Sequence, residues 1–127
     1  MRAKAASPAA MLSMLMRIAS LLPTQTRRSE ESQSLQQFST PIGLAYVATF
    51  AAAITPADVV LEPSAGTGHL AVLAELAGGS LVLNEVAESR AGILGQIFPA
   101  VPTTRFDAAH INDHLDACIV PSVVLMN

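Results

Sequence analysis

Two carboxylates and a glycine-rich segment have a spacing that is typical of a nucleoside-binding site. The segment 62–68, Glu-Pro-Ser-Ala-Gly-Thr-Gly, follows the apolar run 59–61 and precedes a stretch with helical apolar spacing. Gly66 and Gly68 permit positive φ angles and let a ligand approach the backbone N–H groups. Glu85 lies 19 residues after Gly66, close to the roughly 20 expected for an acid that binds a ribose.

The ligand predicted by this pattern is cationic. Glu62 stands at the end of the apolar run, where its charge would repel a pyrophosphate but attract a cation. Ala71 stands where a third glycine of the G-x-G-x-x-G pattern is expected. Both features disfavour an NAD-dependent oxidoreductase, although that class shares the ribose-binding acid.

Two further polar residues fall where later strands are expected to end, Asp107 and Asn127. Ligands of open α/β sheets bind at the carboxyl ends of strands. Each signal also has a simpler interpretation: a Gly-x-Gly alone is weak evidence, Glu85 could be a solvated acid at a helix start, and Asp107 an ordinary N-cap. Their occurrence at successive strand ends favours one shared site.

The three histidines do not indicate a metal site. His69, His110 and His114 lack the spacing with carboxylate or cysteine partners that such a site requires. We predict no bound metal and expect His110 and His114 to be surface or half-buried residues.

The first predicted helix begins at Ser7-Pro8, an N-cap and N1 pair, and ends before Pro23. The apolar residues of this helix repeat with helical spacing: Met11, Leu12, Leu15, Ile18, Ala19 and Leu22. Residues 24–36 are polar and predict a linker.

A second helix is predicted over residues 42–54, with Thr40 as its cap and Pro41 at its first position. This stretch is apolar nearly all round, so both of its faces are expected to be covered.

After residue 57, apolar strand-like runs alternate with helical patterns, which predicts βαβ units and a parallel sheet. With right-handed crossovers the expected strand order is 3-2-1-4. The third strand contains Pro102 and is expected at an edge. The expected strands are 58–62, 81–85, 101–106 and 122–126. Helices are expected over 69–77 and 108–115. Another helix is expected between the second and third strands, where it is marked by Ile93, Leu94, Ile97 and Phe98.

Composition fits one soluble α/β domain. The chain has 127 residues, of which 51% are hydrophobic and 13% charged, as suits a buried parallel sheet. Arg17 interrupts the longest candidate for a membrane span. The lone Cys118 excludes an internal disulfide, so we expect a reduced, cytoplasmic setting. The basic start could be a targeting sequence, but no small-residue cleavage site follows, and a packing helix is the better interpretation.

The charges are unevenly distributed. Residues 1–28 carry five of the seven cations and no acid, whereas from Ser29 onward ten acids stand against Arg90 and Arg105. The predicted sheet therefore offers no broad basic face, and most affinity for any nucleic acid would have to come from elsewhere.

Residues 35–127 resemble the front half of a class I S-adenosylmethionine-dependent methyltransferase of the amino-group type, which includes N6-adenine DNA methylases. The resemblance rests on residues 37–41, 61–68, 84–85, 106–108 and 124–127. It implies an N-terminal half of the Rossmann-like methyltransferase fold with extra N-terminal helices. The implied catalytic residue is Asn127, and the implied cofactor-binding residues are Phe38, Thr40, Pro41, Glu62, Ser64, Ala65, Gly66, Gly68, Glu85, Asp107 and Ala108.

The strings 36–41 and 62–68 are most similar to the methylase-like N-terminal domain of bacterial strawberry-notch-like helicase proteins. In this family, an Asn-Pro-Pro-aromatic tetrapeptide accepts both N–H bonds of the target amino group and stacks on a flipped base. The resemblance places Asn127 at the start of that tetrapeptide. Adenine, cytosine and a protein glutamine are all acceptors of such sites.

Because the sequence stops at Asn127, we expect the two prolines, the aromatic and three further strands to be missing, and the 127 residues alone to be inactive. Residues 1–34 are expected to form a helix and linker, and 35–127 a partial methyltransferase domain. DNA would be contacted through parts outside this chain, with a helicase domain in the intact parent. The alternative is a non-catalytic nucleotide-sensing or interaction domain of a DNA-remodelling helicase protein.

Overall fold

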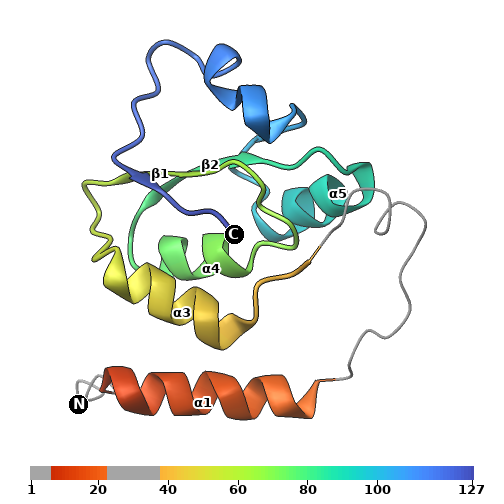
Figure 1. The fold of residues 1–127 in the computed structure, drawn as a ribbon. Helices are drawn as coiled ribbons and strands as arrows, with labels where there is room; N and C mark the ends of the chain where they lie inside the picture. Colours follow the sequence, from red (N-terminus) through yellow and green to blue (C-terminus); the bar gives the residue numbers. More distant parts are fainter. Residues whose placement is uncertain (1–6, 23–37) are drawn as a thin grey trace.

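The computed structural model describes residues 7–22 and 38–127. In these ranges a four-stranded sheet is combined with α-helices and a short 3-10 helix (Figure 1). The elements are α1 (Pro8–Leu21), α3 (Ile42–Ala51), β1 (Val59–Glu62), α4 (His69–Leu76), β2 (Ser80–Asn84), α5 (Glu88–Ile97), β3 (Thr103–Thr104), η1 (Ala108–Asp113) and β4 (Val123–Val124).

The sheet has the order β3-β2-β1-β4, and every neighbouring pair is parallel. The predicted α/β class and the predicted order 3-2-1-4 are therefore confirmed. Val60 pairs with Leu81 of β2 and with Val123 of β4. Since β1 lies between two partners, its last residue, Glu62, is at the centre of the carboxyl edge.

Two apolar clusters hold α3, α4 and α5 against the sheet, and α4 contributes to both. The first contains Ala45, Ile54, Val60, Leu70, Ala74 and Leu125. The second contains Ala65, Ala71, Leu83, Leu94 and Phe98. Burial of these side chains stabilises the fold and holds the start of α4 against the end of β1.

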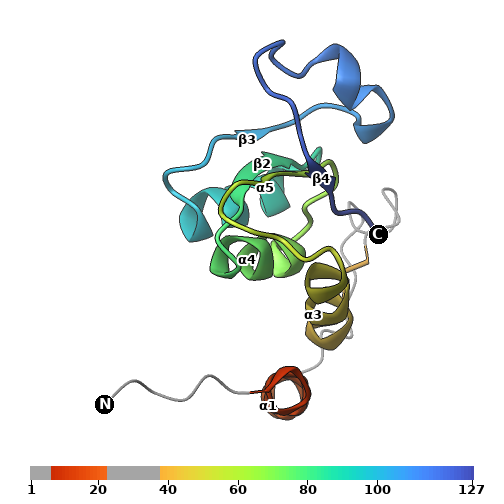
Figure 2. The same cartoon turned by 90° about the vertical axis from the view of Figure 1, so that its left-hand side faces the viewer.

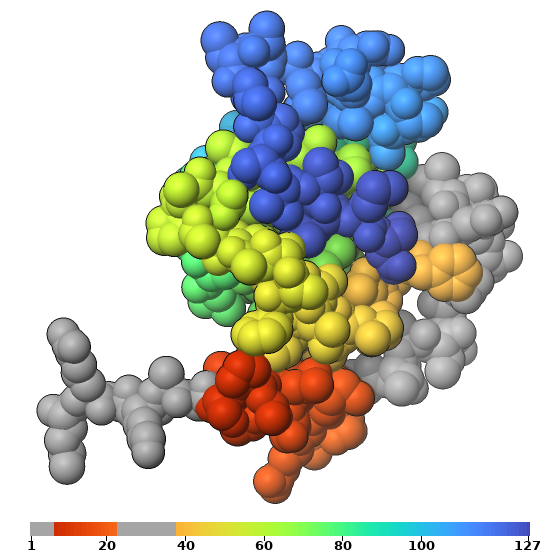
Figure 3. Space-filling view, turned by 60° about the vertical axis from the view of Figure 1, so that its left-hand side comes forward, coloured from red at the N-terminus to blue at the C-terminus, as the bar shows by residue number. Residues whose placement is uncertain are grey.

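Helix α1 forms as predicted and packs on the outside of α3 (Figures 1 and 2). The Ser7 hydroxyl accepts a hydrogen bond of 3.3 Å from the Ala10 N–H, which caps the helix at Pro8. None of its residues is buried, and Figure 3 shows α1, in red and orange, at the edge of the molecule. The predicted linker 24–36 and the boundary between residues 34 and 35 lie outside the described residues.

Two expectations for α3 are wrong. Pro41 occupies the N-cap position, and no side chain within residues 7–22 and 38–127 caps the helix. The helix is also not covered on both faces: Leu44, Val47 and Phe50 are 63%, 49% and 61% exposed. The reason is that the core-facing side of α3, through Ala45, is the side that packs on Leu70 and Ala74 of α4. Helix α1 also packs on α3 but leaves these three side chains exposed.

The last elements are shorter than predicted. Strands β3 and β4 have two residues each, and residues 108–113 form a 3-10 helix, with His110 in a non-helical conformation. Pro102 and Pro121 precede the two strands and cannot donate ladder hydrogen bonds. Figure 2 shows η1 and its flanking chain, in blue, projecting beyond the sheet. Across residues 7–22 and 38–127, no helix has the length and apolar character to cross a membrane.

Candidate functional site

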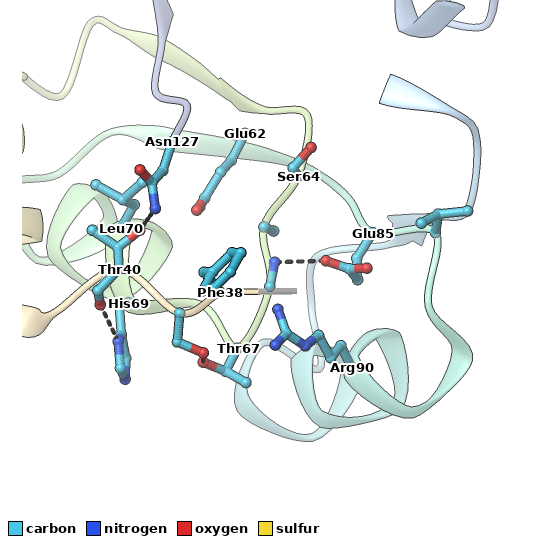
Figure 4. Close-up of a pocket in the computed structure, with 14 residues that line it drawn as sticks. Phe38, Thr40, Glu62, Ser64, Thr67, His69, Leu70, Glu85, Arg90 and Asn127 are labelled. Carbon is cyan, nitrogen blue, oxygen red and sulfur yellow. Dashed lines mark hydrogen bonds between the residues drawn. The ribbon is translucent and has the colours of Figure 1, made fainter. Parts of the chain in front are cut away.

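A cavity of about 420 Å³ lies at the carboxyl ends of β1, β2 and β4 (Figure 4). Its walls come from the turn after β1, the start of α4, the residues after β2, α5 and the chain before α3. The lining residues are Phe38, Ser39, Thr40, Glu62, Ser64, Ala65, Gly66, Thr67, His69, Leu70, Glu85, Val86, Arg90 and Asn127.

Glu62 presents an unsatisfied carboxyl group to this cavity. Its side chain points inward (Figure 4), it is 2% exposed, and its Oε2 atom has no hydrogen-bond partner in the part of the chain that the structure describes. Burial raises the pKa of Glu62 to about 8; the Glu85 carboxylate also raises it, and the Ala71 backbone N–H opposes the shift. The group is therefore largely protonated at neutral pH, and an incoming cation would favour its ionised form.

Glu85 is held by backbone groups on both oxygens. Oε2 accepts from the Gly66 N–H at 2.8 Å and Oε1 accepts from the Ala87 N–H at 2.9 Å. Glu85 is buried, so it is not the solvated acid that the simpler interpretation would require. Each carboxylate oxygen can accept a second hydrogen bond, which leaves capacity for hydroxyl groups of a ligand.

The two glycines of the turn have different functions. Gly66 lines the cavity with a φ of 59°, and a Cβ there would be 3.4 Å from Nη1 of Arg90. Gly68 is the N-cap of α4 with a φ of 85°, and a Cβ there would be 3.0 Å from Leu94 and from Phe98. Gly66 therefore keeps the cavity open, whereas Gly68 permits close packing of α4 on α5.

The segment 38–41, which we call the strap, runs along the start of α4. The hydroxyls of Ser39 and Thr67 are 3.5 Å apart. The carbonyl oxygen of Thr40 accepts a hydrogen bond of 2.6 Å from Nδ1 of His69. Because a carbonyl can only accept, Nδ1 carries the proton, and the strap is tied to the first turn of α4.

The strap is also tied to the end of β4. Nδ2 of Asn127 donates to Oγ1 of Thr40 at 3.0 Å. The Thr40 side chain therefore does not cap α3 but contacts the implied catalytic residue. The Leu125 N–H donates to the Leu61 carbonyl oxygen at 2.9 Å, which continues the pairing of β4 with β1 almost to Asn127.

Asn84, the last residue of β2, joins the ends of three strands. Its Nδ2 donates to the carbonyl oxygens of Pro63 and Phe106, both at 2.9 Å. Its Oδ1 accepts from the Phe106 N–H at 2.9 Å and the Thr104 hydroxyl at 2.8 Å. With 1% exposure and four hydrogen bonds, Asn84 holds the rim of the site together.

Eight of the twelve residues implied by the resemblance line the cavity, and four do not. The carboxylate of Asp107 is exposed and accepts from the Ala109 N–H at 3.0 Å, so it is an ordinary N-cap for η1. Pro41, Gly68 and Ala108 also lie outside the lining. The residues brought together are Phe38, Thr40, Glu62, Ser64, Ala65, Gly66, Glu85 and Asn127.

Six further residues line the cavity without a predicted role there: Ser39, Thr67, His69, Leu70, Val86 and Arg90. Of these, Arg90 carried a signal, since it is one of only two cations after residue 28 and follows Glu85 by little more than one helical turn.

His110 is exposed as expected, and His114 stacks on Phe106 with ring centroids 4.0 Å apart.

No protein-family model and no curated protein matches the chain. It is similar to the crystal structure of a candidate RNA methyltransferase from Pyrococcus horikoshii, with 22% sequence identity and a TM-score of 0.66. The match covers 92% of this chain and 58% of that one, so the chain spans somewhat more than half the length of this neighbour. The described residues therefore have a Rossmann-like methyltransferase fold.

Proposed function

We propose that these residues form the S-adenosylmethionine-binding part of a methyltransferase that acts on an amino group. One observation carries the proposal. Glu62, a buried carboxyl whose Oε2 has no hydrogen-bond partner among the described residues, faces the same cavity as a second buried carboxyl, Glu85. Such a cavity suits a ligand that carries both positive charge and hydroxyl groups. The methyltransferase fold of the neighbour supports the same class of cofactor.

The residues present fit this cofactor. Its ammonium group would satisfy the orphaned oxygen of Glu62, and its ribose hydroxyls would donate to Glu85. The absence of a side chain at Gly66 leaves room for the ligand against the backbone. A pyrophosphate would be repelled by the Glu85 carboxylate and would offer no cation to the buried carboxyl group of Glu62, which argues against a dinucleotide.

S-adenosylmethionine would supply an electrophilic methyl group. The part of the chain described here would bind and orient it, and Asn127 would orient the acceptor at the cavity wall. The hydrogen bond to Thr40 uses the Asn127 nitrogen, so its amide oxygen can accept an N–H of the target. By accepting that N–H, Asn127 would reduce the conjugation of the nitrogen lone pair and would hold the amino group in a fixed orientation in the cavity. We propose N6 of adenine in DNA as the acceptor.

Nucleic acid would be held largely by other parts of the protein. Residues 38–127 carry eight acidic residues against Arg90 and Arg105, and such a surface does not attract phosphates. We therefore propose that residues 1–127 bind the cofactor without transferring methyl groups, and that a helicase domain or similar partner supplies the DNA contacts. RNA is the alternative acceptor, since the structural neighbour is a candidate RNA methyltransferase.

The same Asn127–Thr40 hydrogen bond favours one second candidate, a non-catalytic nucleotide-sensing domain. In that case Asn127 would serve only to fix the strap. Asn127→Ala would then weaken cofactor binding in residues 1–127, and the intact protein would bind the cofactor without turnover.

Isothermal titration of residues 1–127 with S-adenosylmethionine, S-adenosylhomocysteine and NAD tests the proposal. We expect both adenosyl compounds to bind and NAD not to bind. Glu62→Ala should weaken S-adenosylmethionine binding, whereas Glu75→Ala, at an exposed position of α4, should not. Binding of NAD in preference to both adenosyl compounds would reject the proposed function.

A further inference from the structure

We propose that Arg90 and Glu85 form one subsite that recognises the vicinal hydroxyls of a ribose, with Glu85 as acceptor and Arg90 as donor. The inference rests on the proposed function, which it extends by naming a second residue that selects the ligand. Arg90 would bind the ligand directly and would distinguish a ribose from its deoxy forms.

Arg90 and Glu85 meet at the same residue of the turn. Arg90 extends from the first turn of α5, and its Nη1 is 3.4 Å from the position of a Cβ on Gly66. The N–H of Gly66 donates to Oε2 of Glu85 at 2.8 Å. Both side chains line the cavity, and Figure 4 shows them on the same side of it.

The guanidinium of Arg90 has no protein partner within residues 7–22 and 38–127: it makes neither an ion pair nor a hydrogen bond there. Arg105 shows the contrast, since it pairs with Glu88 at 3.5 Å and donates to the Val86 carbonyl oxygen at 3.2 Å. Arg90 is half-buried and close to a carboxylate that it does not bond. Its donors are available to a ligand between the two groups.

The chemistry of this pair selects a diol. Glu85 can only accept hydrogen bonds when ionised, and Arg90 can only donate them. A hydroxyl group does both, so two adjacent hydroxyls can donate to Glu85 while their oxygens accept from Arg90. A phosphate has acceptors for Arg90 but would be repelled by Glu85 and would leave it unsatisfied. A ligand carboxylate would likewise be repelled by Glu85 and would leave it unsatisfied.

The test compares ligands that differ only at the ribose. Residues 1–127 and the variants Arg90→Ala, Arg90→Lys and Arg105→Ala are titrated with S-adenosylhomocysteine, its 2′-deoxy and 3′-deoxy analogues, and adenosine. We expect Arg90→Ala to weaken binding of the parent compound and of adenosine about tenfold, as for loss of a charged hydrogen bond. Arg90→Lys should lose less, and Arg105→Ala should match the wild type.

The deoxy analogues give the decisive comparison. At least one deoxy analogue should bind the wild type about tenfold more weakly than S-adenosylhomocysteine does. The affinity for that analogue should fall little further in Arg90→Ala, because the analogue lacks the hydroxyl that Arg90 contacts. Equal losses for all ligands would show that Arg90 does not contact a hydroxyl. A loss for S-adenosylhomocysteine but not for adenosine would place Arg90 on the amino-acid carboxylate. Either result overturns the inference.

Failure of the proposed function has a separate signature. If the wild type binds adenosine but not S-adenosylhomocysteine, the methyltransferase proposal is rejected, and the Arg90 subsite is decided by adenosine and its deoxy forms. Binding of neither ligand overturns both. Thermal unfolding of each variant checks folding, and Arg90→Ala should unfold close to the wild type because its guanidinium stabilises no other described residue.

Discussion

The backbone N–H of Gly66 donates a 2.8 Å hydrogen bond to the Glu85 carboxylate. The turn after β1 and the acid after β2 are therefore one structural unit, not two separate ligand contacts. The shape of the turn depends on Glu85, and the orientation of Glu85 depends on the turn. This coupling determines what substitution of either residue is expected to do.

Glu85→Ala removes the acceptor of two backbone donors, Gly66 and Ala87. We expect S-adenosylhomocysteine binding to weaken by about 1–3 kcal/mol, the cost of leaving such groups unsatisfied. Glu85→Gln keeps one acceptor oxygen and should lose less. Calorimetry measures both, with the exposed Glu75→Ala as the control. Unchanged affinity in Glu85→Ala would remove this residue from the site.

Glu62 should make stability depend on pH. Its pKa rises from 4.5 to about 8 on folding, so the folded state keeps a proton that the unfolded state releases. The resulting stabilisation is fully present below pH 4.5 and is lost as the pH rises through about 8, by up to about 1.4 kcal/mol per pH unit. Urea unfolding from pH 5 to 8 should show this slope, and Glu62→Gln should reduce it. Parallel curves for the two proteins would contradict the assignment.

Binding of S-adenosylmethionine should show the opposite dependence on pH. Its ammonium group binds the ionised form of Glu62, so affinity should increase from pH 6 to pH 8. The increase should be smaller in Glu62→Gln. Calorimetry in two buffers of different ionisation enthalpy also measures the proton released on binding. An increase of the same size in the variant would exclude Glu62 as its source.

Asn84→Asp should destabilise the rim of the cavity. The change replaces two donors to the Pro63 and Phe106 carbonyls by a carboxylate that repels them. We expect a loss of at least about 1–3 kcal/mol in the free energy of unfolding, since the position is buried. Asn112→Asp, at an exposed position of η1, is the matched control. Equal stability of the two variants would show that Asn84 does not hold the strand ends together.

The two glycine-to-alanine variants should separate binding from stability. Both place alanine at a positive φ, which costs about 1–2 kcal/mol. Gly68→Ala adds contacts of 3.0 Å with Leu94 and Phe98, so it should destabilise the fold more than Gly66→Ala. Gly66→Ala should weaken ligand binding more, because Gly66 lines the cavity and its Cβ would take up space that the ligand needs beside Arg90. Denaturant unfolding of both variants measures the difference in stability, and calorimetry measures the difference in ligand affinity.

The sheet could be predicted because each strand and helix is marked by a pattern within a short segment of the sequence. The runs around Val60 and Leu83 are apolar and bounded by turn residues, and their alternation with helical patterns allows few topologies. The positions of Glu62, Glu85 and Asn127 at one edge follow from that topology, since parallel strands end on the same side. Those parts of the site were therefore accessible from the sequence.

The remaining details depend on contacts between distant segments. Thr40 precedes a helix and has the residue type of a cap, but in the fold its hydroxyl accepts from Asn127. Asp107 looked like a ligand-binding acid because it follows a strand, yet that strand is a short edge and its carboxylate caps η1. No periodicity in the sequence shows that Asn84 would bond Phe106.

The hydrogen bonds of the strap also have a consequence for folding kinetics. They join residues 28, 29 and 87 positions apart in the chain, and contacts of such long sequence separation form after local ones. The wall of the cavity is therefore expected to be completed late, after the transition state for folding. A ligand that needs the finished wall would slow unfolding and leave the folding rate nearly unchanged.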